Sequence, residues 1–441
     1  MGRMFAMALL AALGSSSMIA AASAQPPPVA TAPAVVDGKA VAAEVRRLIA
    51  ENYVLPEVRS KLDAALAKGL ASGRYDVADG NELAKRLNED MAAVAHDKHL
   101  GIRFSPGEAG MLKGRQGDDR TEGPAFDRMA QVRNHGLREM RVLEGNVRYL
   151  AVDGFAWTGP KSAEAYDTAM RFLKDADAVI IDLRQNGGGS PEAVQYLISH
   201  FVEPEKPLVT FYMGRDKVDK VASLVSLPAG RMTGKPLYVL TSGRSASAAE
   251  EFAGHVSGYK LGELIGETTA GAGFRNDLFP VASQFVLSVS VGRAVLASTN
   301  ADWEGRGIAP TVAVAPDKAL DVAQMRAVKK IAATVTSPYE KQAYEGLATM
   351  LAARLDPAKP ALPLSAYAGR FGDGKITLEN GRLVVAGPDG RPRTLLPLGQ
   401  NLFAIDGEAM AKVEFQTVGG TVSSFDIIFP DGNRMKQARV Q

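Results

Sequence analysis

The sequence predicts an α/β protein with an N-terminal helical bundle and a small C-terminal all-β domain. Before residue 96, apolar residues recur at spacings of three and four, as on one face of a helix. Strand and helix signals then alternate, which is the pattern of βα units around a parallel sheet. Beyond residue 363, short apolar segments are separated by Gly-containing turns. A chain of 441 residues is also too long for one ordinary core.

The first 24 residues have the order of a secretory signal. Arg3 is followed by the apolar run 4–13, and Ala22-Ser23-Ala24 is a typical cleavage site. The alternative is an uncleaved membrane anchor, but the run is short for a span of about 20 residues. We therefore expect an exported protein, periplasmic or extracellular, with no integral membrane segment after the signal (1–24) is cleaved. A Pro- and Ala-rich linker, 25–37, follows it.

Composition narrows the class of partner. The formal charge of +2 is small and dispersed, so we expect no nucleic-acid partner. The lack of cysteine excludes disulfides, thiolate metal sites and a cysteine nucleophile. Composition alone favours a small-molecule or peptide partner and leaves the oligomeric state open.

Domain boundaries are expected where the pattern changes. The expected parts are a helical domain at 38–105, a connecting loop region at 106–142, the α/β core at 143–354, a linker at 355–362 and the β domain at 363–441. In the core we expect strands at 147–152, 178–183, 207–212, 236–240, 264–266 and 285–291, and helices at 162–173, 191–201, 247–256 and within 317–354. In the β domain we expect strands at 376–378, 383–385, 413–415 and 425–429.

A glycine-rich turn follows the buried strand at 178–183. Its sequence is Asp182-Leu183-Arg184-Gln185-Asn186-Gly187-Gly188-Gly189. Glycines leave backbone N–H groups uncovered, so that they can face an anion. The alternative is a tight strand-to-helix turn without a ligand, and the motif fits neither common phosphate-binding pattern.

Ser247 lies where a later strand leads into a helix, in Ser245-Ala246-Ser247-Ala248-Ala249-Glu250. The helix N-terminus could present its hydroxyl, with the Ala248 N–H pointing at an oxyanion on a substrate. However, Ser247-x-x-Glu250 also matches a capping box, so the serine could serve only as a helix cap. The small flanking residues favour catalysis, because a substrate needs room.

A serine nucleophile needs a base, and the chain has five histidines. His255 is on the same predicted helix as Ser247, about 12 Å along its axis, and His200 lies at the far end of another helix. His99, in Asp97-Lys98-His99-Leu100, lies at a helix-to-strand junction, where active sites are often assembled. Glu304, in a Gly-rich loop, could orient an imidazole, although it could equally be a solvated residue of a surface turn.

Four motifs in order resemble one family. They are Asp-Leu-Arg-x-Asn-Gly-Gly-Gly from Asp182, Ser-Ala-Ser-Ala-x-Glu from Ser245, Gly-Glu-Thr-Thr-x-Gly from Gly266 and Trp-Glu-Gly-x-Gly-Ile-x-Pro from Trp303. The set resembles the clan of C-terminal processing (tail-specific) proteases, the tricorn protease core and interphotoreceptor retinoid-binding protein. The resemblance spans residues 40–345. It implies a crotonase/ClpP-like α/β catalytic core, a peptide or protein substrate, and no cofactor or metal.

The branch of the family decides which base to expect. The processing proteases use a Ser/Lys dyad, and Ala272 stands at the lysine position here. Their usual peptide-binding PDZ domain also has no room in the short stretch between Phe104 and Val147. The sequence is therefore more similar to the tricorn-like branch, which uses Ser, His and Glu.

The resemblance carries this triad over to Ser247 as nucleophile, His99 as general base and Glu304 as the orienting carboxylate. It also implies an oxyanion hole from the Ala248 N–H and that of Gly188 or Gly189. One position departs from the tricorn pattern, because Lys98 stands where that branch has a second serine. Asp97 or a water could then connect Glu304 to His99.

Two other functions remain open at this point. One is a non-catalytic binding protein for a hydrophobic or peptide ligand on the same fold, since the clan includes a retinoid carrier. The other is a crotonase-like acyl-CoA enzyme, because the cores are related in shape. Intact Ser247, His99 and Glu304 favour the serine peptidase over the first, and export away from the CoA pool disfavours the second.

Overall fold

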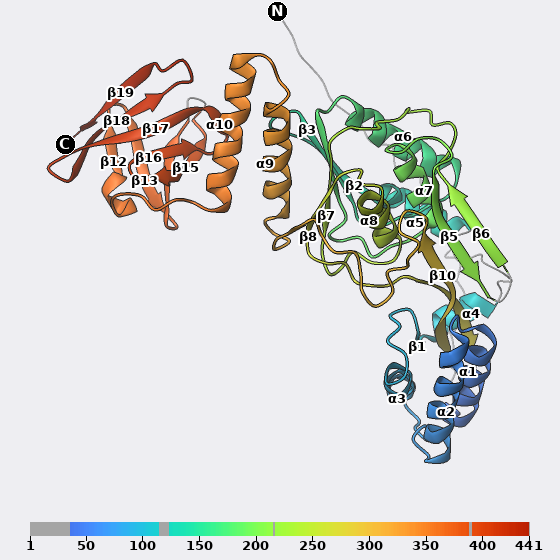
Figure 1. Ribbon diagram of the computed structural model, residues 1–441. Coiled ribbons are helices and arrows are strands. Elements are labelled where there is room, and N and C mark those ends of the chain that lie inside the picture. Colours follow the sequence, from blue (N-terminus) through green and yellow to red (C-terminus); the bar gives the residue numbers. More distant parts are fainter. Residues whose placement is uncertain (1–35, 114–122, 215–216, 388–389, 441) are drawn as a thin grey trace, which may run out of the picture. The chain divides into compact units, whose positions relative to one another are not determined.

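The computed structural model describes residues 36–113, 123–214, 217–387 and 390–440 (Figure 1). The predicted signal peptide and nearly all of the predicted linker lie outside these ranges. The chain divides into two units, Met1–Val36 and Asp37–Gln441, and the account below concerns the second. The sequence-based domain boundaries stay predictions.

Three helices form the N-terminal bundle, as expected: α1 (Gly38–Asn52), α2 (Pro56–Ala71) and α3 (Gly80–Ala92). The side chains of Asp37 and Asp79 cap α1 and α3 by accepting N–H groups of the first turn. Strand β1 (Gly101–Phe104) then pairs antiparallel with β10 (Phe285–Leu296) of the core. This pairing brings the α3–β1 junction, which contains His99, to the core.

The stretch 106–142 is not the connecting loop that we expected. It contains α4 (Pro106–Lys113), α5 (Pro124–Val132), the 3₁₀ turn η2 (Asn134–Gly136) and most of β2 (Leu137–Leu143). Each helix begins at a proline, which suits the first helical position because its missing N–H has no intrahelical acceptor there. The glycines and charges of this stretch masked that signal.

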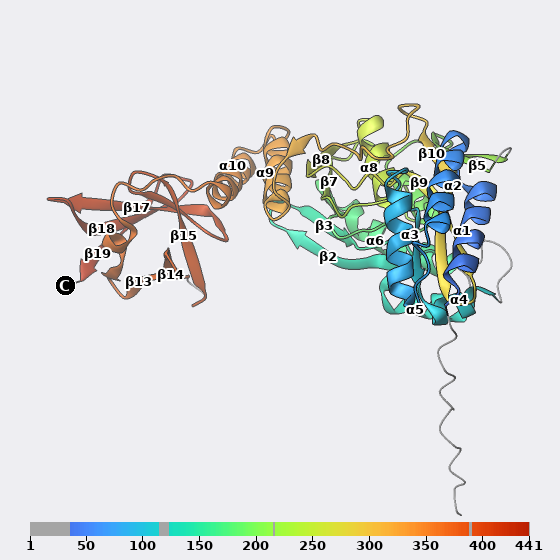
Figure 2. The ribbon, with the colours of Figure 1, turned by 90° about the horizontal axis from the view of Figure 1, so that it is seen from below.

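The main sheet has the order β11-β8-β7-β4-β3-β2 and confirms the α/β class (Figure 2). Its strands are parallel except for the antiparallel pair β2–β3. Their bounds are β3 (Val147–Val152), β4 (Ala178–Asp182), β7 (Leu237–Thr241), β8 (Glu263–Gly266) and β11 (Val312–Ala313). Helices α6 (Pro160–Lys174), α7 (Pro191–Ser199) and α8 (Ala248–Gly258) lie between these strands in the chain.

Alternation along β4 explains why both faces of this sheet are covered. Val179 and Ile181 belong to the core cluster that contains α6, α7 and α8. Ala178 and Ile180 point the other way, toward α9 (Ala319–Ala332). Successive strand residues face opposite sides, so a strand buried on both sides is a continuous apolar run.

A second sheet joins the N-terminal bundle to the core through β1. Its order is β1-β10-β5-β6, and β9 also pairs with β10. The bounds are β5 (Pro207–Met213), β6 (Lys217–Ala222) and β9 (Phe274–Val281). Strands β6 and β9 were not expected, because β6 is mostly exposed and polar and β9 is only half-buried over most of its length.

The C-terminal region is a closed barrel, which follows α10 (Pro338–Leu355) and the 3₁₀ turn η3 (Leu364–Tyr367). Its strands are β12 (Gly369–Phe371), β13 (Gly374–Glu379), β14 (Arg382–Ala386), β15 (Pro392–Gly399), β16 (Leu402–Ile405), β17 (Glu408–Val418), β18 (Thr421–Ile428) and β19 (Arg434–Val440). Five aromatic side chains fill it: Tyr367, Phe371, Phe403, Phe415 and Phe425. The all-β prediction is confirmed, although β12, β15, β16 and β19 were missed because only every second barrel residue must be apolar.

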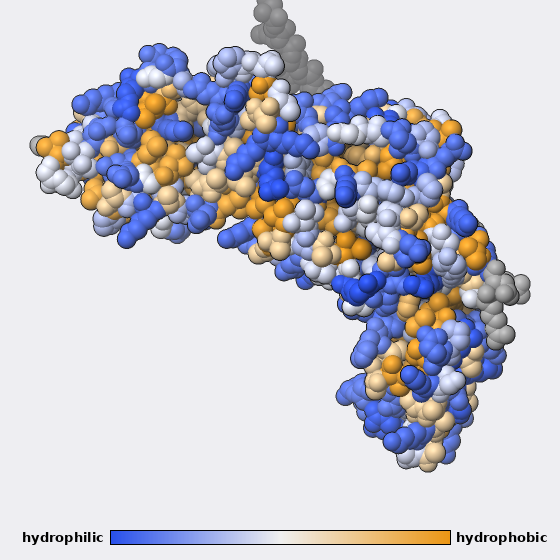
Figure 3. All heavy atoms as spheres, viewed as in Figure 1, coloured by the Kyte–Doolittle hydropathy of each residue, from blue (hydrophilic) through white to orange (hydrophobic). Residues whose placement is uncertain are grey.

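Hydrophilic residues cover most of the face in Figure 3, with smaller apolar areas between them. Among the helices of the described ranges, none is both long and apolar enough to cross a membrane.

Candidate active site

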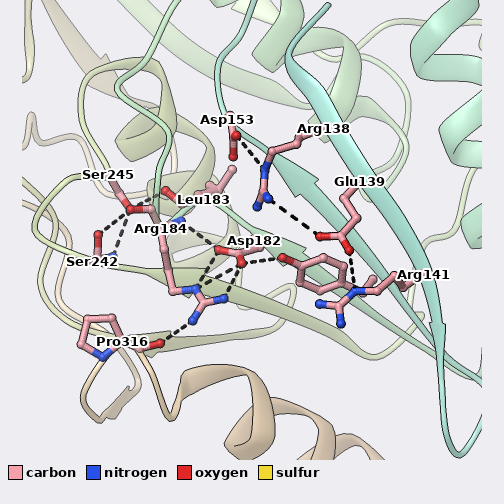
Figure 4. Close-up of polar contacts among 11 residues, drawn as sticks. Arg138, Glu139, Arg141, Asp153, Asp182, Leu183, Arg184, Ser242, Ser245 and Pro316 are labelled. Carbon is pink, nitrogen blue, oxygen red and sulfur yellow. Dashed lines mark hydrogen bonds and ion pairs between the residues drawn. The ribbon is translucent and has the colours of Figure 1, made fainter. Parts of the chain in front are cut away.

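Asp182 and Arg184 fix the start of the glycine-rich turn (Figure 4). Asp182 accepts hydrogen bonds from the Tyr149 hydroxyl at 2.7 Å and from Arg184 Nη2 at 2.6 Å. Burial pushes the pKa of Asp182 upward, but the hydrogen bonds from Arg184 and Tyr149 outweigh it and leave the pKa below its usual range. Arg184 also donates to the Pro316 carbonyl, so the turn is tied to the segment before α9.

Two serines join this turn to the loop that carries Ser247. The Ser242 hydroxyl donates to the Arg184 carbonyl oxygen at 2.7 Å, and the Ser245 hydroxyl donates to that of Leu183 at 2.8 Å (Figure 4). Both serines are buried. Ser242 and Ser245 therefore have a structural role, which is to hold the two loops together.

Gly188 comes closest to Ser247. A Cβ atom on Gly188 would lie 2.8 Å from the Ser247 Cβ, and the φ of Gly188 is +111°. Only glycine fits such a position. The Gly188 N–H donates to Asn186 Oδ1 at 2.8 Å, whereas Gly189 lines the same pocket as Ser247 and Ala248.

Ser247 directly precedes α8 and has an unusual backbone, with φ +54° and ψ −119°. A non-glycine residue at positive φ is uncommon and costs of the order of 1–3 kcal/mol. An ordinary helix cap has an extended backbone instead. The conformation of Ser247 must be held by its surroundings.

The side chain of Glu250 holds the backbone of Ser247 in this conformation. It is fully buried, and its carboxylate accepts four hydrogen bonds from two segments. The donors are Ser247 N–H at 2.9 Å, Ala272 N–H at 2.7 Å, Gly271 N–H at 2.6 Å and the Thr269 hydroxyl at 2.6 Å. Sequence analysis gave Glu250 only a capping role, because its contacts with 269–272 are not local in sequence.

His99 reaches this site from the N-terminal bundle. Its backbone N–H donates to Asp97 Oδ1 at 2.8 Å, and its carbonyl oxygen accepts the Ser288 hydroxyl of β10. Burial lowers the pKa of His99 below its ordinary value, against the charges of Asp97 and Glu250, which raise it. The charge of Glu250, the carboxylate that accepts the Ser247 N–H, thus acts on the imidazole.

Glu304 is held at the start of β9. Its Oε2 accepts the Gly273 N–H at 2.5 Å and the Phe274 N–H at 3.0 Å. Burial raises the pKa of Glu304 to about 7; the charge of Asp97 also raises it, and the two backbone hydrogen bonds act in the opposite direction. Glu304 is thus half-buried and is not the solvated residue of a surface turn.

The charge of Asp97 raises the pKa of both His99 and Glu304. Within the described residues, three buried atoms of this group have no hydrogen-bond partner: Asp97 Oδ2, His99 Nδ1 and Glu304 Oε1. The phenol of Tyr53, at the end of α1, also belongs here, since burial and the charges of Asp97 and Glu304 raise its pKa. Sequence analysis missed Tyr53, which continues an apolar helical stripe and so looks like a core residue.

Two of the other histidines are packed elsewhere. His135 Nδ1 lies 2.8 Å from the Ser162 hydroxyl, and His200 Nδ1 lies 2.9 Å from the Tyr196 carbonyl oxygen. Of the lysines near these motifs, Lys98 donates to the Ala270 carbonyl, and Lys260 lies beyond the far end of α8, an 11-residue helix about 16 Å long that begins after Ser247.

A pocket of about 280 Å³ opens beside Ser247. Its lining includes Ser247, Ala248, Gly189 and Ala272, the residue at the position of the missing lysine. Part of the glycine-rich turn and part of the Ser247 loop therefore face one cavity. In the part of the chain that the structure describes, no cluster of His, Cys, Asp and Glu is arranged to hold a metal ion.

Several curated proteins resemble part of this chain. Carboxy-terminal processing protease CtpB of Bacillus subtilis is 27% identical over 180 residues, covering 40% of this chain and 35% of that protein. Tail-specific protease of Haemophilus influenzae is 34% identical over 98 residues, covering 22% of this chain and 14% of that protein. The chain thus spans about a third or less of the length of these relatives.

Solved structures with a similar fold include the photosystem II D1 C-terminal processing protease and the tricorn protease. The first has a TM-score of 0.42 at 15% identity, covering 64% of this chain and 94% of that one. The second has a TM-score of 0.41 at 13% identity, covering 71% of this chain and 36% of that one. At such scores the matches add nothing to the assignment.

Family descriptions match two adjoining stretches. Residues 146–314, which contain Ser247, Glu304 and the glycine-rich turn, match peptidase family S41. Residues 37–134, which contain His99 and Tyr53, match the N-terminal domain of peptidase S41 in eukaryotic IRBP. The two stretches make up more than half of the chain and follow the order predicted from the four motifs and the helical bundle. The chain therefore belongs to peptidase family S41 and carries an N-terminal domain of the type described in eukaryotic IRBP.

Proposed function

We propose that the protein is an exported serine peptidase that hydrolyses peptide bonds with Ser247 as nucleophile, His99 as general base and Glu304 as orienting carboxylate. The observation that carries the proposal is the backbone of Ser247, whose φ of +54° at the start of α8 suits a presented nucleophile and differs from the extended backbone of an ordinary helix cap, although Glu250 also completes a capping box with it. Membership of family S41 supports the same reaction class.

The chemistry needs only groups of this chain and one water. Ser247 Oγ attacks the peptide carbonyl carbon while His99 takes the hydroxyl proton. The C–N bond breaks when His99 gives this proton to the leaving amine, which leaves an acyl ester on Ser247. Water then attacks the ester as His99 takes its proton, and the proton returns to Ser247 Oγ when the carboxylic acid leaves.

The oxyanion of both steps would be held by backbone N–H groups. Ala248, the first residue of α8, lies at the positive end of that helix. Gly189 is the better second donor, because the Gly188 N–H already donates to Asn186 Oδ1. Gly188 then has a steric role, which is to let the turn approach Ser247.

Asp97 is the proposed connection between Glu304 and His99, in place of the serine that Lys98 replaces. Its Oδ1 fixes the backbone of the His99 loop, while its Oδ2 is one of the three buried atoms that lack a partner. Tyr53 is the proposed neighbour that keeps this group in place, since its phenol is buried beside Asp97. Such a buried polar group is stable only if its members satisfy one another or enclose a water.

Export is the second half of the proposal. The supporting pattern is Arg3, the apolar run 4–13 and Ala22-Ser23-Ala24. A protein sent to the periplasm or outside the cell would begin at Gln25. N-terminal sequencing of the protein recovered outside the cytoplasm tests this, and recovery of an intact N-terminus would contradict it.

The test of the reaction is labelling by a fluorophosphonate, followed by mass spectrometry of the labelled peptide. We expect one adduct, on Ser247, that is absent from Ser247→Ala. His99→Ala should slow the labelling strongly, whereas Lys98→Met should not. A folded protein without an adduct would favour the non-catalytic binding protein instead.

A further inference from the structure

The pocket beside Ser247 has a mixed lining. Its apolar wall consists of buried side chains, among them Phe211, Phe274, Ala294 and Trp303. The Trp303 indole donates to the Ala272 carbonyl oxygen at 3.1 Å, which fixes that wall. A volume of about 280 Å³ is at the low end for ligand pockets and suits a single side chain.

Glu251 is the unexpected member of this lining. It lies one helical turn after Ser247, and its N–H donates to the Ser247 carbonyl oxygen at 3.0 Å. Both residues line the pocket, so the side chain of Glu251 lies in the same cavity as Ser247. The side chain is only 4% exposed.

The carboxylate of Glu251 has little to compensate its burial. Within the described ranges its ion-pair partner is His255, at 3.5 Å from Nε2 to Oε1. His255 is fully buried, and neither of its ring nitrogens has a hydrogen-bond partner among those residues. A buried carboxylate that accepts so few hydrogen bonds is costly, so a donor from a bound ligand would stabilise it.

The remaining charges on the lining leave it acidic. Glu192 on α7 and Arg275 on β9 line the same pocket, so the lining carries two acids and one base. Glu192 is exposed and accepts the Ser190 hydroxyl, whereas Glu251 is buried. The buried acid of the lining is therefore Glu251, one helical turn after Ser247.

We propose that Glu251 makes this pocket select lysine or arginine as the residue whose carbonyl Ser247 attacks, an inference that rests on the proposed function. The aromatic wall suits the aliphatic stem of such a side chain, and the carboxylate suits its cationic end. A charge-assisted hydrogen bond of this kind is worth about 10- to 100-fold in rate over a neutral side chain of the same shape.

Four peptidyl diphenyl phosphonates test the proposal, with lysine, norleucine, arginine or citrulline at the position that enters the pocket. Each pair differs in charge but hardly in size, and inactivation of Ser247 is followed by mass spectrometry without any need for turnover. We expect lysine and arginine to inactivate about 10- to 100-fold faster than norleucine and citrulline. Glu251→Gln should reduce this preference to below threefold, whereas Glu192→Gln should leave most of it.

Equal or faster inactivation by the neutral compounds in the wild type would overturn the proposal, and so would an unchanged preference in Glu251→Gln. If Glu251→Gln fails to fold, the comparison of charged with neutral phosphonates on the wild-type protein still tests the proposal. A general fluorophosphonate is the control for the function itself. Labelling by it without reaction with any of the four phosphonates counts against the pocket alone, whereas no labelling at all counts against the serine peptidase.

Discussion

Among the serines of this chain that match the capping-box pattern, two differ clearly in structure. Ser337-x-x-Glu340 precedes α10, and Ser247-x-x-Glu250 precedes α8. Ser337 has an extended backbone, with φ −70° and ψ 120°, and its hydroxyl accepts the Glu340 N–H at 3.3 Å. Ser247 has φ +54°, and its carbonyl oxygen accepts the Glu250 N–H at 2.8 Å.

The two glutamates differ even more. Glu340 is exposed, whereas Glu250 is fully buried and holds four donors from two segments. The pattern S-x-x-E thus serves a local purpose in one helix and a long-range purpose in the other. A motif that describes four neighbouring residues cannot distinguish the two, because the difference lies in what the glutamate contacts.

Replacement of the two serines should give opposite results, and this is the largest effect that we expect. Ser247→Ala should reduce turnover by about 10⁴- to 10⁶-fold and leave the melting temperature nearly unchanged. Ser337→Ala should keep full turnover and lower the stability by about 1 kcal/mol, because a cap is lost. Peptide hydrolysis assays and thermal melts of both variants decide. Substantial turnover by Ser247→Ala would show that Ser247 is only a helix cap, like Ser337.

The second prediction concerns His99, the proposed base, which follows the helices of the N-terminal bundle. His99 is proposed to take the proton of Ser247, whereas the role of Ser337 as a helix cap needs no base. We expect His99→Ala to lose about 10⁴-fold in kcat/KM, nearly as much as Ser247→Ala. Lys98→Met is the matched neighbour and should lose less than fivefold. If Lys98→Met were the inactive one, the mechanism would be a Ser/Lys dyad after all.

Replacement of Glu250 and Glu340 by glutamine tests whether the two glutamates have different roles. Glutamine offers one acceptor oxygen and an NH₂ donor, so Glu250→Gln would turn a donor toward two of the four groups that Glu250 now accepts. We expect kcat to fall about 100-fold with little change in KM, because the backbone of Ser247 loses its hold before substrate binding does. Glu340→Gln should change neither constant. Wild-type kcat in a folded Glu250→Gln variant would refute the role of Glu250 as a clamp.

Much of this arrangement could be predicted from the sequence, because it depends on patterns among neighbouring residues. The continuous apolar run of β4 predicted a strand buried on both faces, and the motifs around Asp182 and Ser247 follow such strands directly. The three helices before residue 96 were predicted for the same reason, since an amphipathic stripe repeats within a few residues.

The parts that could not be predicted depend on contacts between distant segments. Tyr53 and Glu250 look like a core aromatic and a helix cap until β1 pairs with β10 and the 269–272 segment lies against α8. The burial of Glu251 could not be predicted from the sequence, because it depends on distant segments that form the pocket. Prolines at the start of α4 and α5 were a local signal, but the surrounding glycines and charges outweighed it.

The pH profile of the reaction should reveal the buried neighbours of Ser247. Catalysis needs neutral His99 and ionised Glu304. Burial lowers the pKa of His99 below 6.5 and raises that of Glu304 to about 7, so Glu304 sets the limit. We expect kcat/KM to fall up to tenfold per pH unit below about 7. A profile that stays flat down to pH 6 would show that ionised Glu304 is not required.

The smallest expected effect is on stability, and it again separates a buried glutamate from an exposed one. The pKa of Glu304 is about 7 in the folded state against an ordinary value of 4.5, so the folded state binds this proton more tightly. The stability contributed by Glu304 is therefore present below about pH 4.5, falls as the pH rises to about 7 and is lost above that.

Glutamine carries no charge in this range, so Glu304→Gln should escape the loss. We expect it to melt higher than the wild type at pH 8, by on the order of a few degrees, and the gap to close toward pH 5. Glu340→Gln, at an exposed cap, should show no such pH-dependent gain. Thermal melts of the three proteins between pH 5 and 8 measure this difference. If Glu304→Gln instead melted lower at pH 8, the ionised carboxylate would be stabilised by its neighbours, and Glu304 could not be the group that limits activity near pH 7.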